Sequence, residues 1–102
     1  MKRLFISQPM RGKTDDEILA ARERAVESAE RNLGEKVEVI DSYFQNIPES
    51  ENTALWCLGK SLELMADADI VYFAPGWEDA RGCRIENQAA LEYGLDIIED
   101  YH

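Results

Sequence analysis

Hydrophobic residues concentrate along this chain in short runs separated by longer amphipathic stretches. The runs occupy residues 4–6, 37–40, 70–74 and 95–98, and each is bounded by polar residues, glycine or proline. Runs of this length and setting predict buried β-strands. The run at 70–74 is the most continuous, which predicts a central strand covered on both faces, and the run at 95–98 predicts an edge strand.

The first amphipathic stretch begins with a helix-start signal. Thr14 and Glu17 have the spacing of a capping box, and Gly34 is placed to end the helix. The apolar face is predicted from residues that recur at helical spacing: Ile18, Leu19, Ala21, Ala25, Val26, Ala29 and Leu33. The remaining side chains are expected in solvent: Arg22, Glu23, Glu27, Glu30 and Arg31.

Two further helices are predicted at 53–66 and 83–93. In the first, capped by Ser50 or Asn52, the apolar face is formed by Leu55, Leu58, Leu62 and Met65. In the second, which Gly94 ends, the inner face is formed by Ile85, Ala89, Ala90 and Tyr93. Residues 42–52 and 77–82 are expected to be loops. Strands that alternate with helices predict one α/β domain over residues 1–102, with a parallel sheet of about four strands.

Composition narrows the possible partners. The chain carries 21 acidic and 11 basic residues, a formal net charge of -10. Because this balance repels a phosphate backbone, we expect no polymeric nucleic acid, although a local basic cluster can still bind one small anion. A domain of 102 residues has a modest core. We therefore expect a partner subunit, in a homodimer or higher homo-oligomer.

The cellular compartment is predicted from the absence of a disulfide framework, a signal peptide and a membrane-spanning run in the sequence. Cys57 and Cys83 are too few for a disulfide framework and are expected to be free thiols. The first residues lack a signal-peptide core, and no run approaches the roughly 20 apolar residues of a membrane span. We expect a cytoplasmic protein without membrane contact. Two distant cysteines and a terminal histidine, His102, predict no metal site, and no cofactor is expected because dinucleotide and P-loop motifs are absent.

Candidate binding chemistry lies after the first and third predicted strands. Ligands of open parallel sheets bind at the carboxyl ends of the strands, and these two loops contain Arg11, Lys13, Arg81 and Arg84. Gly12 and the amides that begin the next helix are suited to a phosphate. Solvated loop charges are the alternative, above all for Lys13. The residues predicted to bind substrate are Ser7, Gln8, Met10, Arg11, Gly12, Lys13, Trp77, Arg81, Gly82 and Asn87.

Glu86 is the candidate catalytic residue. It lies early in the third helix, so its carboxylate is expected to face the cleft while Ile85 and Ala89 face the core. A carboxylate there can act as the nucleophile, or as an electrostatic stabiliser, at the anomeric carbon of a sugar. The alternative is an acid that merely stabilises a helix N-terminus.

Three neighbouring residues have two interpretations each. Trp77 can stack on a base or pack against the fold. Asp79, a second catalytic candidate, can polarise a substrate hydroxyl or cap the following helix. Asn87 is turned about 100° from Glu86, so it can reach a partner subunit or only solvent.

Segments 5–12, 66–77 and 82–94 resemble the nucleoside 2-deoxyribosyltransferase superfamily, in particular its small DUF4406 branch. The resemblance implies a three-layer flavodoxin- or Rossmann-like fold, a homo-oligomer, and attack by the glutamate at position 86 on C1′ of a 2-deoxyribonucleoside. Related deoxynucleoside 5′-monophosphate N-glycosidases have an Arg-Gly that matches Arg11-Gly12 and binds the 5′-phosphate. The resemblance therefore favours a nucleoside or nucleoside monophosphate ligand.

The chain departs from that superfamily at two positions. Phe5 occupies the place of a tyrosine that orients the glutamate, and Ala80 occupies an acidic or serine position. Three functions stay open on sequence grounds. They are N-glycosidic bond cleavage or deoxyribosyl transfer through a glutamate nucleophile, nucleotide binding without catalysis, and a plain interaction domain.

Overall fold

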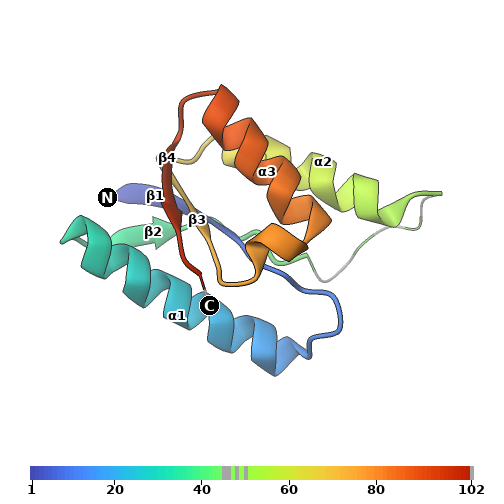
Figure 1. The fold of residues 1–102 in the computed structure, drawn as a ribbon, viewed down its shortest axis with the longest axis horizontal. Coiled ribbons are helices and arrows are strands. Elements are labelled where there is room, and N and C mark those ends of the chain that lie inside the picture. The colour runs from blue at the N-terminus through green and yellow to red at the C-terminus, as the bar shows by residue number, and fades with distance from the viewer. Residues whose placement is uncertain (45–46, 48, 50, 102) are drawn as a thin grey trace.

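The computed structural model describes residues 1–44, 47, 49 and 51–101, and shows one sheet between two helical layers. Four parallel strands lie in the order β2-β1-β3-β4. Helix α1 covers one face of the sheet, and α2 and α3 lie side by side on the other (Figure 1). The predicted three-layer α/β fold of flavodoxin or Rossmann type is confirmed. The elements are β1 Lys2–Ser7, α1 Asp15–Leu33, β2 Val37–Val39, α2 Thr53–Met65, β3 Ile70–Phe73, the 3-10 turn η1 Trp77–Asp79, α3 Arg81–Glu92 and β4 Asp96–Glu99.

The two central strands supply both cores because successive side chains point to opposite faces. Leu4 and Ile6 of β1 face α1, where Ala25 and Ala29 let the helix approach closely. Phe5 lies on the other face, in a cluster formed with Ile40, Met65, Ala68, Val71, Phe73 and Ala90. A sheet buried on both faces explains why its central strands appear in the sequence as unbroken apolar runs.

Strand register brings the two candidate loops together. Ser7, the last residue of β1, pairs with Phe73, the last residue of β3, and the Ala74 amide donates to the Ser7 carbonyl at 2.9 Å. Because the strands are parallel and end level with each other, the loops that follow them leave the sheet at the same edge.

Local capping signals in the sequence are confirmed. The Thr14 hydroxyl accepts from the Glu17 amide while the Glu17 carboxylate accepts from the Thr14 amide, and Gly34 ends α1 with a φ of 71°. Asn52 caps α2 by accepting from the Leu55 amide. The alternative cap Ser50 and the terminal His102 lie outside the described residues.

Several predicted apolar faces are wrong. Leu19 of α1 is exposed. Leu62 is exposed and Leu55 is 60% exposed, because α2 buries only Met65 and meets the sheet through its last turn. A second copy of the chain could cover the exposed leucines, but self-association stays a prediction.

No helix in the described ranges is long and apolar enough to cross a membrane.

Helix α3 is rotated about its axis relative to the prediction. Ile85 is exposed and Tyr93 is 85% exposed, whereas the buried residues are Cys83, Glu86, Asn87 and Ala90. The helix also begins two residues earlier than predicted, at Arg81. The face that carries Glu86 is therefore the face that packs on the sheet.

We expect Thr14→Ala to lower the free energy of unfolding by about 1 kcal/mol, because the variant loses a side-chain helix cap. Urea denaturation followed by circular dichroism measures the change. Thr53→Ala is the matched control, since Thr53 is exposed and the cap of its helix is Asn52. Equal losses in the two variants would contradict a specific capping role for Thr14.

Candidate functional site

A cavity of about 650 Å³ opens at the sheet edge where β1 and β3 end. Its walls come from the loops after β1 and β3, the start of α3, one side of α2 and the segment after β2. This size is typical of small-molecule sites. The lining residues are Phe5, Ile6, Ser7, Gln8, Pro9, Met10, Arg11, Ser42, Phe44, Ile47, Ala54, Cys57, Ser61, Gly76, Asp79, Ala80, Arg81, Gly82, Cys83, Arg84 and Glu86.

Glu86 lines this cavity from the buried face of α3 and is only 7% exposed. Its Oε1 accepts a hydrogen bond from the Ser7 hydroxyl at 2.7 Å. Burial raises the pKa of Glu86, while hydrogen bonding by the hydroxyls of Ser7 and Ser61 lowers it. The expectation that the Glu86 carboxylate and Arg11 share one cavity is met, although Glu86 reaches it from the core side of the helix.

Cys83 lies three residues before Glu86, and burial raises the pKa of its thiol to about 11. The thiol is therefore neutral near pH 7 and a poor nucleophile. Cys83 and Cys57 are both free thiols, as predicted, and both line the cavity. Among the ionisable groups on the cavity wall, Glu86 is the buried one that can supply a charged oxygen.

Basic side chains gather at the cavity mouth. Arg11, Arg81 and Arg84 are exposed and line the cavity, and the Arg84 Nη1 donates to the Glu78 carbonyl at 3.1 Å. The ion pairs found among the described residues involve neither these arginines nor Glu86. The guanidinium groups of these three arginines are therefore able to bind an anion from solution.

The two helices that begin near the cavity differ in their capacity for anions. Helix α1 carries a capping box and three acids in its first turn, so its N-terminus is already satisfied and negatively charged. The N-cap of α3, Ala80, makes no side-chain bond, and the first turn of α3 contains no acid. Its first residues, Arg81, Gly82 and Cys83, line the cavity. The N-terminus suited to a phosphate is that of α3, not the predicted one.

Some predicted binding residues lie outside the cavity lining. Gly12 has a φ of 77° in a turn closed by the Lys13 amide and the Met10 carbonyl, so the turn itself requires glycine. Lys13 is exposed beside it and does not line the cavity. Of this loop, Ser7, Gln8, Met10 and Arg11 reach the cavity wall.

Trp77 is positioned by packing rather than by the cavity. Its ring lies 5.5 Å from that of Phe73 and 6.0 Å from that of Tyr101, between centroids. Its Nε1 is buried without an acceptor in the described part of the chain. Of its two interpretations, packing against the fold is the one observed.

The interpretations of Asn87 and Asp79 are also resolved geometrically. Asn87 does not face solvent, because α3 buries it and its Nδ2 donates to Glu99 Oε2 of β4 at 2.8 Å. Asp79 is exposed and lines the cavity, and it does not cap α3, whose N-cap is Ala80.

Several cavity residues were missed from the sequence. Ala54, Cys57 and Ser61 share one face of α2, a spacing visible in the sequence but masked by the leucines between them. Arg22 was expected in solvent, yet it is half-buried and hydrogen-bonded to Gln8 and Ser42, two lining residues. No sequence signal distinguishes it from the other charged residues of α1.

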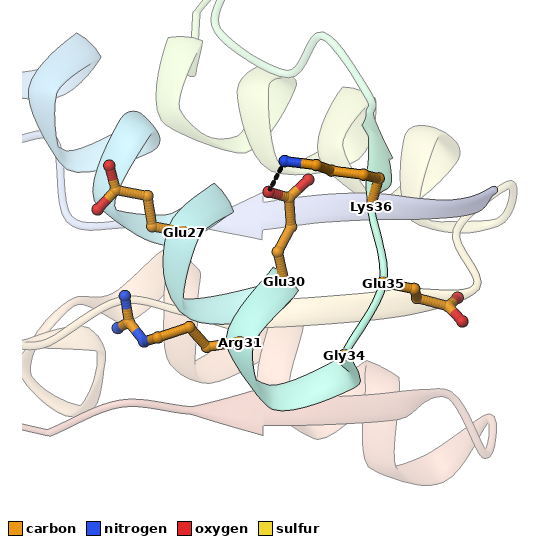
Figure 2. Close-up of a pocket in the computed structure, with 6 residues that line it drawn as sticks. All are labelled: Glu27, Glu30, Arg31, Gly34, Glu35 and Lys36. Atoms are coloured by element: carbon orange, nitrogen blue, oxygen red, sulfur yellow. Dashed lines mark hydrogen bonds and ion pairs between the residues drawn. The ribbon is translucent and has the colours of Figure 1, made fainter.

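A second depression lies between the end of α1 and the start of β2, and does not form a comparable site. Figure 2 shows Glu27, Arg31 and Glu35 directed apart from one another, while Lys36 pairs with Glu30. Glu30 also accepts from the Val37 amide, so its carboxylate joins helix to strand.

Within residues 1–44, 47, 49 and 51–101, no group of three or more potential ligands is arranged to hold a metal ion.

We expect Glu86→Gln to stabilise the chain at neutral pH but not in acid. Because burial raises the folded-state pKa of Glu86, its ionised form disfavours folding, and the native chain loses stability as pH rises from about 4.5 through that pKa. Glutamine keeps an acceptor for Ser7 without the charge. Urea denaturation of both proteins between pH 4 and pH 8 tests this. A difference in unfolding free energy that does not grow with pH would contradict the raised pKa.

Comparison with known proteins gives one match. The family described as "Domain of unknown function (DUF4406)" matches residues 2–99, which contain every residue of the cavity wall. No curated protein and no solved structure matches the chain. Since the match covers nearly all of the 102 residues, the chain belongs to the DUF4406 family.

Proposed function

We propose that this protein cleaves the N-glycosidic bond of a 2-deoxynucleoside or its 5′-monophosphate, with Glu86 as the nucleophile. The observation that carries the proposal is a carboxylate with little solvent exposure, in a cavity whose mouth bears several guanidinium groups. Glycosidic bond cleavage develops positive charge at the anomeric carbon, which a fixed carboxylate stabilises.

The basic mouth favours a monophosphate over a free nucleoside. Arg11, Arg81 and the uncapped start of α3 offer charged and backbone donors at one end of the cavity. A phosphate bound there would place its attached sugar one helical turn deeper, near Glu86. The formal charge of -10 on the whole chain disfavours larger polyanions.

The reaction proceeds in two displacements. A Glu86 oxygen attacks C1′, the C1′–N bond breaks, and the base leaves with the bonding electrons and takes a proton from water. A second water then attacks C1′ of the glycosyl ester and gives its proton to the hydroxide left by the first, which yields the free sugar or sugar phosphate and restores the carboxylate. With a second base in place of water, the outcome is deoxyribosyl transfer. Asp79, which lines the cavity, is suited to accept a hydrogen bond from a sugar hydroxyl.

The resemblance to nucleoside 2-deoxyribosyltransferases supports this assignment. That superfamily orients its glutamate with a strand-one tyrosine, which this chain replaces with Phe5, a side chain without a donor. The Ser7 hydroxyl, two residues further along the same strand, donates to Glu86 and fills the same requirement. The missing tyrosine therefore does not remove the hydrogen bond.

Nucleotide binding without turnover is the second candidate. The observation that favours it is the absence of any acid at position 80, where the resemblance implies an acidic or serine residue. The same cavity would then sense a nucleotide, with Glu86 as a hydrogen-bond acceptor only.

We expect the purified protein to release free base from at least one deoxynucleoside or deoxynucleoside 5′-monophosphate, measured by chromatography. Glu86→Ala should reduce release by about a thousandfold or more, as expected for loss of a nucleophile. Ser28→Ala, a buried serine outside the cavity, is the control for general damage. Binding of the same compounds without any base release would favour the sensing alternative.

We expect Arg11→Ala to weaken binding of a deoxynucleoside 5′-monophosphate by about tenfold, since a charge-assisted hydrogen bond is lost. The matching nucleoside, without phosphate, should bind both proteins equally in calorimetry. Lys13→Ala removes the same charge two residues away but outside the cavity, and should cost less than about threefold. Equal losses for nucleoside and nucleotide would argue against phosphate binding at Arg11.

A further inference from the structure

We propose that Gln8 and Ser42, oriented by Arg22, form a subsite of hydrogen-bond donors that binds a carbonyl oxygen of the base. This inference rests on the proposed function and names the part of the ligand that the far side of the cavity recognises. The residues belong to three elements that meet at one point: the end of β1, the middle of α1 and the segment after β2.

Arg22 is a half-buried cation satisfied by neutral groups. Its Nη1 lies 3.3 Å from Ser42 Oγ and 3.5 Å from Gln8 Oε1, and its Nη2 lies 3.3 Å from the Ile40 carbonyl. Neither ion pair found among the described residues includes it. The Asp41 carboxylate acts on this guanidinium electrostatically but does not pair with it among the described residues, so part of the positive potential of Arg22 remains next to the cavity.

Donor chemistry fixes how Gln8 and Ser42 are oriented. A guanidinium has no acceptor, so both side chains must present oxygen to Arg22. The Gln8 amide is fixed a second time, because its Nε2 donates to the Ile18 carbonyl at 3.1 Å and a carbonyl can only accept. Its amide orientation is therefore set by two independent partners.

The hydrogen-bonding groups left unpaired on these two side chains are mainly donors. Ser42 accepts from Arg22, and none of the described residues takes its hydroxyl hydrogen. Gln8 uses one Nε2 hydrogen on Ile18 and keeps the other. Both residues line the cavity and are buried, with Ser42 only 4% exposed. A ligand that leaves these donors unpaired would forfeit hydrogen bonds at two buried side chains.

The base, rather than the phosphate, fits this end of the cavity. Phe44 and Ile47, which follow Ser42 in the chain, line the same cavity and offer apolar surface suited to a flat ring. Three exposed guanidinium groups at the mouth provide a better site for phosphate. Neutral donors beside an apolar wall match a carbonyl oxygen, which is the strongest acceptor that a neutral base carries.

The test compares the four natural deoxynucleoside 5′-monophosphates with 2-deoxyribose 5-phosphate in calorimetry. Adenine is the one base of the four without a carbonyl oxygen, so its nucleotide is expected to bind weakest. Ser42→Ala should weaken the tightest-binding nucleotide by about three- to tenfold, the range for one neutral hydrogen bond, and leave 2-deoxyribose 5-phosphate unchanged. The control is Ser28→Ala, which removes a buried hydroxyl outside the cavity.

The outcomes separate this subsite from the function it rests on. If no deoxynucleotide and no sugar phosphate binds, the proposed function is wrong and the subsite falls with it. If nucleotides bind but Ser42→Ala weakens the sugar phosphate equally, or the adenine nucleotide binds tightest, the subsite is wrong while the function stands.

Arg22→Lys tests the orienting role separately. A lysine keeps the charge but cannot hold three oxygens in a planar fork, so the difference in affinity between carbonyl-bearing bases and adenine should shrink at least about threefold. The sugar phosphate should bind as before. Arg24→Lys, on the exposed side of the same helix, is the matched control. An unchanged difference in affinity between carbonyl-bearing bases and adenine in a folded Arg22→Lys protein would overturn the role of Arg22.

Discussion

The hydrogen bond between Ser7 and Glu86 is the contact on which the site depends. A carboxylate with so little exposure to water needs donors, and the nearest one is the hydroxyl at the end of β1. The contact joins residues 79 positions apart in the sequence, so it exists only when β1 and β3 pair in register and α3 packs on their face. The fold and the candidate chemistry therefore share one geometric requirement.

Most of the fold could be predicted because its signals are local. The capping box of Thr14 and the left-handed Gly34 fix the ends of α1 whatever surrounds the helix. Unbroken apolar runs identify the central strands, and the alternation of elements gives the parallel order. DUF4406 membership over residues 2–99 agrees with a single domain of this size, although it adds no activity of its own.

The site could be predicted only in part, since periodicity describes a helix and not its partners. The sequence directs Glu86 to the cleft and Asn87 to a partner subunit or solvent, with Ile85 on the core side. Ser7 and Glu99 instead supply the hydrogen bonds that let Glu86 and Asn87 face the sheet. Arg22 was misplaced for the same reason, because its acceptors come from β1 and the segment after β2. A tertiary partner for a polar group cannot be read from a single sequence.

Glu86 lines the cavity, and Arg22 lies behind two of its lining residues, Gln8 and Ser42. Each is at least half-buried, and each takes its hydrogen bonds among the described residues from neutral groups. An oppositely charged group paired with each of them would cancel most of the electrostatic field that Glu86 and Arg22 produce in the cavity. Neutral partners satisfy the hydrogen bonds but not the charge, and Asp41 offsets the charge of Arg22 only from a distance, so a negative potential at Glu86 and a positive one behind Gln8 and Ser42 remain. That separation is suited to a ligand that is itself polarised, with an electron-poor carbon at one end of a bond and an electron-rich ring at the other.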